Sequence, residues 1–99
     1  MIRAGDLVID RERFLVTVHG QPVRLTYLEF NTLWAIAEQG GRVLAYDRLA
    51  EALWGGAAPD TRRRLAVIVS RMRAKLGDQA SAIDTVTRVG YRLAPSFAA

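Results

Sequence analysis

Residues 60–77 constrain the fold of this chain most strongly, because their pattern predicts one uninterrupted helix of about four turns. Asp60 or Thr61 can cap its start, Gly77 can close its end, and no proline interrupts it. At about 100° per residue, one face collects the apolar side chains Leu65, Val69, Met72 and Leu76. The remainder of the chain must cover this apolar stripe.

The opposite face of the same helix is cationic. It carries Arg63, Arg64, Val67, Ser70 and Arg71, with Arg62, Arg73 and Lys75 on its flanks. Between Thr61 and Gly77 there are six cations and no acid. A major groove about 12 Å wide admits an α-helix, so this face suits a nucleic acid. A solvated basic surface helix is the alternative.

Charge is divided unevenly along the chain. Residues 1–60 hold 6 basic and 8 acidic side chains, whereas residues 61–99 hold 8 basic and 2 acidic ones. This asymmetry predicts an anionic partner for the C-terminal half. Double-stranded DNA is favoured over a membrane surface, because the basic helix lacks aromatic anchors.

Length and composition predict one domain, residues 1–99, with a core that needs neither a metal nor a disulfide, since the chain has no cysteine. No apolar run approaches the roughly 18 residues of a membrane span, and no signal peptide is recognisable. These features favour a cytoplasmic protein. No cofactor is predicted, and the only histidine, His19, is expected at the surface without a metal.

The first 25 residues predict a small antiparallel sheet. Apolar residues alternate with polar ones, and polar turns are expected at 10–13 and 19–22. The alternating positions are Leu7, Ile9, Phe14, Val16, Val18, Val23 and Leu25, with a short first strand at Ile2 and Arg3.

Two shorter helices follow. Thr26 and Glu29 form a capping box, Leu25 and Phe30 form a hydrophobic staple, and this helix is expected to run to about Ala37. Residues 42–44 predict an extended link, and residues 47–54 a second helix that ends at the Gly- and Pro-containing loop 55–59.

The second and third helices form a helix-turn-helix with an enlarged turn. After a polar connection at 78–82, residues 83–86 and 91–93 predict two strands around a tight turn at 87–90. A hairpin directly after such a helix is a wing. Residues 95–99 predict a frayed tail.

Four segments in this order resemble the DNA-binding effector domain of OmpR/PhoB-type response regulators. They are Leu25-Thr26-Tyr27-Leu28-Glu29-Phe30, residues 41–49 together with Leu53-Trp54-Gly55, residues 69–77, and Val89-Gly90-Tyr91-Arg92-Leu93. The resemblance implies an α+β winged helix-turn-helix with a four-stranded N-terminal sheet, three helices and a C-terminal β-hairpin wing. It also implies that helix 61–76 enters the major groove and that wing 83–93 reaches the adjacent minor groove.

Carried over by position, the resemblance assigns base contacts to Arg63, Arg64, Val67, Ile68 and Arg71. Phosphate or minor-groove contacts fall to Trp54, Arg62, Arg73, Lys75, Thr87 and Arg88. The polymerase-contact loop corresponds to Gly55, Gly56, Ala57, Ala58 and Pro59. Two positions keep a second interpretation: Trp54 could cap the core beneath the second helix, and Ile68 could be buried at the edge of the apolar stripe.

Several residues depart from the family pattern. Ala66 replaces an acid and Ile68 a polar residue, and the usual arginine-glycine pair in the wing reads Thr87-Arg88. Arg88 therefore stands where glycine's tolerance of positive φ is normally used. The family's receiver domain, with its phosphorylatable aspartate, is not contained in these 99 residues. Either the chain is an excised effector domain, or its regulatory partner is something other than a receiver.

The predicted function is sequence-specific DNA binding and transcription regulation, with RNA polymerase and a second copy on direct-repeat sites as further partners. A winged helix used only for protein interaction, through Val67 and Ile68, is the alternative. No enzyme is predicted, because the sequence offers no candidate nucleophile, converging acid pair or phosphate loop.

Overall fold

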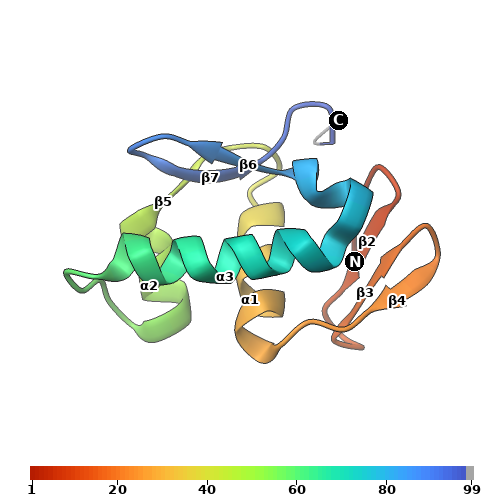
Figure 1. Ribbon diagram of the computed structural model, residues 1–99, viewed down its shortest axis with the longest axis horizontal. Helices are drawn as coiled ribbons and strands as arrows, with labels where there is room; N and C mark the ends of the chain where they lie inside the picture. Colours follow the sequence, from red (N-terminus) through yellow and green to blue (C-terminus); the bar gives the residue numbers. More distant parts are fainter. Residues whose placement is uncertain (98–99) are drawn as a thin grey trace.

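The structure is a computed structural model that describes residues 1–97. Along the chain, an N-terminal antiparallel sheet is followed by three helices and a C-terminal hairpin, and α3 crosses α1 and α2 (Figure 1). This arrangement is the predicted α+β winged helix-turn-helix.

The N-terminal sheet has the four strands that the resemblance implied. They pair in the order β1-β2-β3-β4, with bounds Ile2–Ala4, Leu7–Asp10, Leu15–Val18 and Gln21–Val23. Leu7 pairs with Val18 and Ile9 pairs with Val16. Because alternate residues point to one face, Leu7, Ile9 and Val16 are buried together.

Two residues expected in these strands lie outside them. Phe14 is in the β2–β3 turn with a φ of 53°, and its ring lies 4.0 Å from that of Phe30 and 5.7 Å from that of Tyr27, centroid to centroid. Leu25 lies between β4 and α1. Alternation of apolar and polar residues predicts strands at both positions, because it does not distinguish a strand residue from a turn or linking residue that packs against the core.

Helix α1, Tyr27–Ala37, begins and ends as predicted. The Glu29 amide donates to Thr26 Oγ1 at 3.1 Å, and the Thr26 amide donates to Glu29 Oε1 at 2.9 Å. The predicted capping box is therefore complete.

Helices α2, Tyr46–Trp54, and α3, Thr61–Leu76, are joined by the expected loop. The start of α3 differs from its prediction. Asp60 makes no side-chain cap, and the Thr61 hydroxyl accepts a hydrogen bond from the Ala58 amide at 2.7 Å. Since Thr61 is itself the first helical residue, its hydroxyl stabilises the preceding loop instead of capping the helix.

A 3-10 helix, Gly77–Ala82, leads from α3 into the wing. Strands β6, Ile83–Val86, and β7, Gly90–Leu93, form the predicted hairpin. A third strand, β5, Leu44–Ala45, pairs with β7 in the order β5-β7-β6. The sequence predicted only an extended link at this point. A Cβ at Gly90 would overlap the Leu44 carbonyl group, so this pairing requires glycine.

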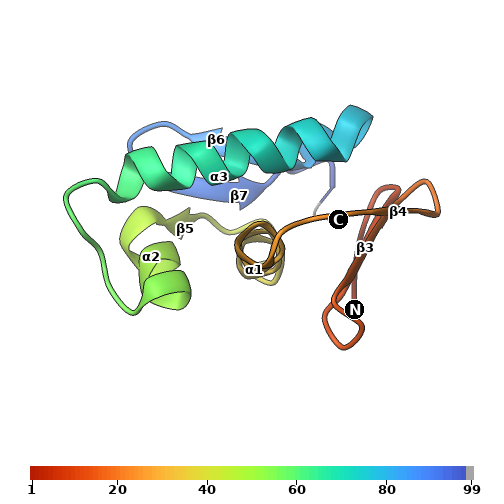
Figure 2. The ribbon, with the colours of Figure 1, turned by 60° about the horizontal axis from the view of Figure 1, so that its bottom comes forward.

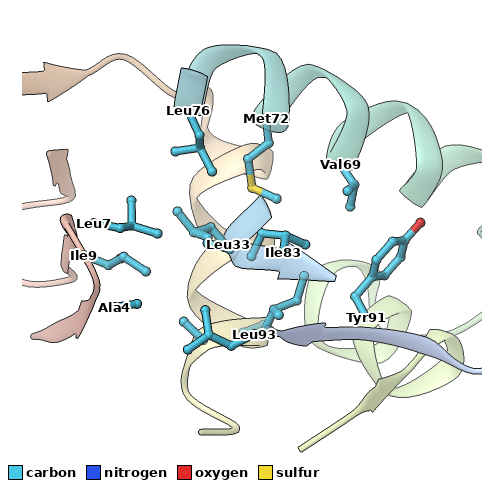
Figure 3. Packing of buried hydrophobic residues seen from close by; sticks show 14 of the residues in the cluster. Ala4, Leu7, Ile9, Leu33, Val69, Met72, Leu76, Ile83, Tyr91 and Leu93 are labelled. Atoms are coloured by element: carbon cyan, nitrogen blue, oxygen red, sulfur yellow. The ribbon is translucent and has the colours of Figure 1, made fainter. Parts of the chain in front are cut away.

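One apolar core joins all of these elements. Figure 3 shows side chains from the N-terminal sheet, α1, α3 and the wing converging on it, among them Leu7, Leu33, Met72, Ile83 and Leu93. The predicted frayed tail is wrong for residues 95–97, because the Phe97 ring packs against this core. Residues 98–99 lie outside the described part of the chain. Figure 2 shows the N-terminal sheet at the end of the molecule opposite the α2–α3 loop.

Candidate nucleic-acid interface

The buried stripe of α3 determines which of its side chains reach solvent. Leu65, Val69, Met72 and Leu76 are at most 1% exposed, as predicted. The residues on the far side of the helix are exposed: Arg63, Arg64, Val67, Ser70 and Arg71. Ile68 is half-buried, which agrees with its position at the edge of the stripe. Core packing thus holds a face rich in arginine toward solvent.

Two arginines at the start of α3 lie against aromatic rings of α2. The guanidinium carbon of Arg64 is 4.0 Å from the centroid of the Trp54 ring, and that of Arg62 is 4.7 Å from the centroid of the Tyr46 ring. Trp54 is also half-buried against the core, so its interpretation as a cap on the core has structural support. The sequence did not predict a role for Tyr46, because no local pattern pairs it with a residue 16 positions later.

The Arg73 side chain donates hydrogen bonds to the wing. Its Nε and Nη2 atoms donate to the Ile83 carbonyl at 3.1 and 2.6 Å, and Nη2 also donates to Thr85 Oγ1 at 2.8 Å. These bonds tie α3 to β6. The guanidinium is therefore engaged in holding the wing against the helix, and the phosphate contact assigned to Arg73 from the sequence stays a prediction.

Lys75 was likewise expected to face phosphate, but its ammonium group lies 2.7 Å from Glu29 Oε1. The Glu29 side chain is only 4% exposed. Burial by itself would raise the pKa of this carboxyl, but hydrogen bonds from Lys75 and Thr26 and the Lys75 charge outweigh burial and lower the pKa. Lys75 thus serves as the partner of a buried carboxylate in the α1 cap.

The wing presents Thr87 and Arg88 at its tip, where both are exposed. Arg88 has a φ of 69°, as its position in place of the family's glycine predicted. Arg62 and Arg88 line one open hollow, together with Tyr46 and Thr61. The start of α3 and the wing tip therefore form one basic surface.

A second hollow, of about 290 Å³, borders the opposite flank of α3 and is mostly apolar. Its lining comprises Leu28, Trp54, Arg63, Arg64, Val67 and Ile68. Leu28, which is exposed, was not predicted as part of the site. The loop residues Gly55, Gly56, Ala57, Ala58 and Pro59 are all exposed.

Residues 1–97 show neither a metal-ligand cluster nor a membrane-spanning helix. No three His, Cys, Asp or Glu side chains come together there as metal ligands. Over the same residues, no helix has the length and apolar character needed to cross a bilayer.

Comparison with known proteins places these features in a family. The family described as "Transcriptional regulatory protein, C terminal" matches residues 20–93. The DNA-binding response regulator MtrA of Mycolicibacterium smegmatis is 37% identical over 98 residues, which are 96% of this chain and 43% of MtrA. The transcriptional regulatory protein CseB of Streptomyces avermitilis is 42% identical over 90% of this chain and 37% of its own length. The chain thus spans less than half the length of these relatives.

Solved structures agree with this assignment. The DNA-binding domain of RstA from Klebsiella pneumoniae, determined in complex with the RstA box, has a TM-score of 0.83 and 33% identity, covering 95% of this chain and 96% of that one. DrrB of Thermotoga maritima, an OmpR/PhoB homolog, has a TM-score of 0.78 and 31% identity over 91% of this chain and 42% of its own. The family match covers residues 20–93, and the structure has the exposed basic helix with the wing beside it. This chain therefore belongs to the family of C-terminal domains of transcriptional regulatory proteins, the OmpR/PhoB-type winged helices.

Proposed function

We propose that this chain binds double-stranded DNA in a sequence-specific manner and thereby regulates transcription. The proposal has α3 in the major groove and the β6–β7 hairpin at the adjacent minor groove. The observation that carries it is the exposed cationic face of α3, which the buried stripe on the opposite face holds outward. The RstA structure named above, whose domain is bound to the RstA box, supports the same ligand.

The proposed base contacts lie on the outermost part of α3. Arg63 and Arg71 can each donate two hydrogen bonds to guanine O6 and N7, and Val67 can contact a thymine methyl group. Ile68 contributes its exposed edge only, since it is half-buried. Phosphate and minor-groove contacts are proposed for Arg62, Trp54, Thr87 and Arg88. The phosphate contacts fix the register without carrying sequence information.

A randomised-site selection with the purified chain, followed by binding titrations over a range of salt concentrations, tests this proposal. Selection should enrich one motif, and the logarithm of affinity should fall with that of salt concentration by about 0.9 per phosphate contact. Arg71→Ala should relax the preference at one position of the motif, whereas Arg62→Ala should weaken every duplex alike. A salt slope near zero with no enriched motif would reject DNA binding.

A protein-interaction module is the second candidate. The apolar hollow lined by Leu28, Trp54, Val67 and Ile68 favours it, because Val67 is 44% exposed beside that hollow. Cross-linking that identifies one protein at Val67, together with no duplex binding at low salt, would favour this candidate over the first.

The remaining parts of the proposal concern the whole protein. Residues 1–99 are proposed to be one domain, because the core connects both sheets with α1 and α3. The exposed loop 55–59 is proposed to contact RNA polymerase, and a second copy is proposed to bind a direct-repeat site. Since the relatives are more than twice as long, a receiver or other regulatory domain is proposed for the rest of the protein. A chromosomal ligand implies a cytoplasmic protein.

A further inference from the structure

Three consecutive arginines at the start of α3 point in different directions. Successive residues of a helix diverge by about 100°, so Arg62 and Arg64 lie on opposite flanks and Arg63 lies between them. Leu65 and Val69 mark the inward direction, because they are 0% and 1% exposed. Arg63 therefore points almost directly outward.

The two flanking arginines are the ones that lie against aromatic rings. Arg64 lies over Trp54 and Arg62 over Tyr46, at 4.0 and 4.7 Å from guanidinium carbon to ring centroid. Tyr46 and Trp54 are the first and last residues of α2. Helix α2 thus lies beneath the start of α3 and supports one arginine at each of its ends.

Both aromatic residues are themselves fixed in place. The Tyr46 ring meets the Tyr91 ring edge-on, with centroids 5.7 Å apart and planes at 88°, and the Tyr46 amide donates to the Val89 carbonyl at 3.2 Å. Trp54 packs against the core. Each ring can therefore restrict the arginine that lies on it.

We infer that Tyr46 and Trp54 are positioning residues that hold Arg62 and Arg64 for the two sugar-phosphate strands bordering the major groove, leaving Arg63 for the bases. This inference rests on the proposed function. A guanidinium stacked through its flat face keeps its N–H edge available to phosphate oxygens. Arg64 consequently changes from a base reader, as the sequence predicted, to a backbone contact.

The test is a double-mutant cycle on DNA affinity. The two probes are the duplex enriched by the randomised-site selection and a scrambled duplex of the same length. Trp54→Leu should weaken binding to both by about two- to fivefold, the range of an exposed cation–π contact. Trp54→Phe should retain most of the affinity. In an Arg64→Ala background, Trp54→Leu should have a much smaller effect, limited to the phosphate contact proposed for Trp54 itself. The same three results are expected for Tyr46→Leu, Tyr46→Phe and Arg62→Ala.

Two further measurements separate positioning from simple loss of structure. A repeated selection with Arg64→Ala should return the wild-type motif, whereas Arg63→Ala should change it. In nuclear magnetic resonance spectra of the free chain, the Arg64 side-chain protons should carry an upfield ring-current shift that Trp54→Leu abolishes. Thermal unfolding of each variant verifies that it is folded at the titration temperature.

Two results would overturn the inference without affecting DNA binding by the wild-type chain. One is that the effects of Trp54→Leu and Arg64→Ala on affinity are additive. The other is that Arg64→Ala changes the base preference. If the wild-type chain showed no salt-dependent binding to either duplex, the proposed function and the inference would both fail.

Discussion

The imidazole of His19 lies between two carboxylates. Its Nε2 atom is 2.9 Å from Asp78 Oδ2, and Nδ1 is 3.4 Å from Asp6 Oδ2. The hydrogen bond and charge of Asp78 raise the pKa of His19, with a smaller contribution from Asp6. The same contact lowers the pKa of Asp78. The sequence predicted the exposure of His19 but not these partners, because Asp78 is 59 residues away.

This contact should make stability depend on pH. A raised folded-state pKa means that the stabilisation is present in full below the unfolded value of about 6.5 and is lost as pH rises through the folded value. His19→Gln should therefore be less stable than wild type at pH 5.5, with the difference shrinking by pH 8.5, as measured by urea unfolding. In Asp78→Asn, the titration midpoint of the His19 ring should fall. An unchanged midpoint would show that the contact does not persist in solution.

Arg88 is strained by its positive φ. A residue with a Cβ in the left-handed region costs about 1 to 2 kcal/mol, and glycine avoids this cost. Arg88→Gly should raise the free energy of unfolding by about 0.5 to 1 kcal/mol, after allowing for the greater entropy of the unfolded chain. Thr87→Gly is the matched control: this neighbour lacks a positive φ, so its replacement should give no gain. Equal effects of the two substitutions in urea unfolding would contradict the strain argument.

Among the elements, α1 matches its sequence prediction most closely, both in its bounds and in its capping box. Its cap uses residues three positions apart, so the sequence pattern is sufficient to predict it. Thr26→Ala should cost about 1 kcal/mol of unfolding free energy.

Glu29→Gln tests the charge on this cap separately, because glutamine can also complete a capping box. It should destabilise by about 1 kcal/mol at pH 7 through the loss of the Lys75 pair. A lowered folded-state pKa means that this stabilisation is present above the unfolded pKa and disappears as pH falls through the folded one. Urea unfolding at pH 7 and pH 3 measures the difference, and a constant destabilisation at both values would exclude the ionic contribution.

The tie between α3 and β6 depends on one side chain. Arg73→Ala would leave the Ile83 carbonyl without its charged donor, so it should destabilise the fold by about 1.5 to 3 kcal/mol. Arg71→Ala, two positions earlier and exposed, should stay within about 0.5 kcal/mol of wild type. Chemical denaturation of both variants provides the comparison. If the two lost equal stability, the bonds to the wing would contribute nothing.

The sequence predicted what local patterns encode: all three helices, the wing hairpin, and the exposed face of α3. It did not predict β5, because two residues carry no periodicity and their pairing partner is more than 40 residues away. It also did not predict that Arg73 contacts Ile83 or that Lys75 contacts Glu29, because these partners lie on other elements. Charge identifies a basic face, but only tertiary contacts show which cations on it are already engaged.

At the scale of the molecule, one core couples the N-terminal sheet to the wing. Leu33 is 0% exposed at the centre of the region in Figure 3. Leu33→Ala should lower the free energy of unfolding by about 2 to 5 kcal/mol. Hydrogen exchange of the most protected amides of β2 and β7 should accelerate by the same factor, because both strands share this core. Val89→Ala, at an exposed position of the wing, is the control. Faster exchange in only one sheet would show that the two unfold separately.

The pairing of β5 with β7 connects the wing directly to the start of α2, since β5 ends at Ala45 and α2 begins at Tyr46. Arg73 fastens the other wing strand to α3. The wing therefore has little freedom to swing relative to α3. In the proposed complex the protein sets the spacing between its two groove contacts, and the double helix must bend or twist to match. Operators with easily deformed steps such as TA and CA between these contacts should consequently bind more tightly than stiff A-tracts that offer the same contacted bases.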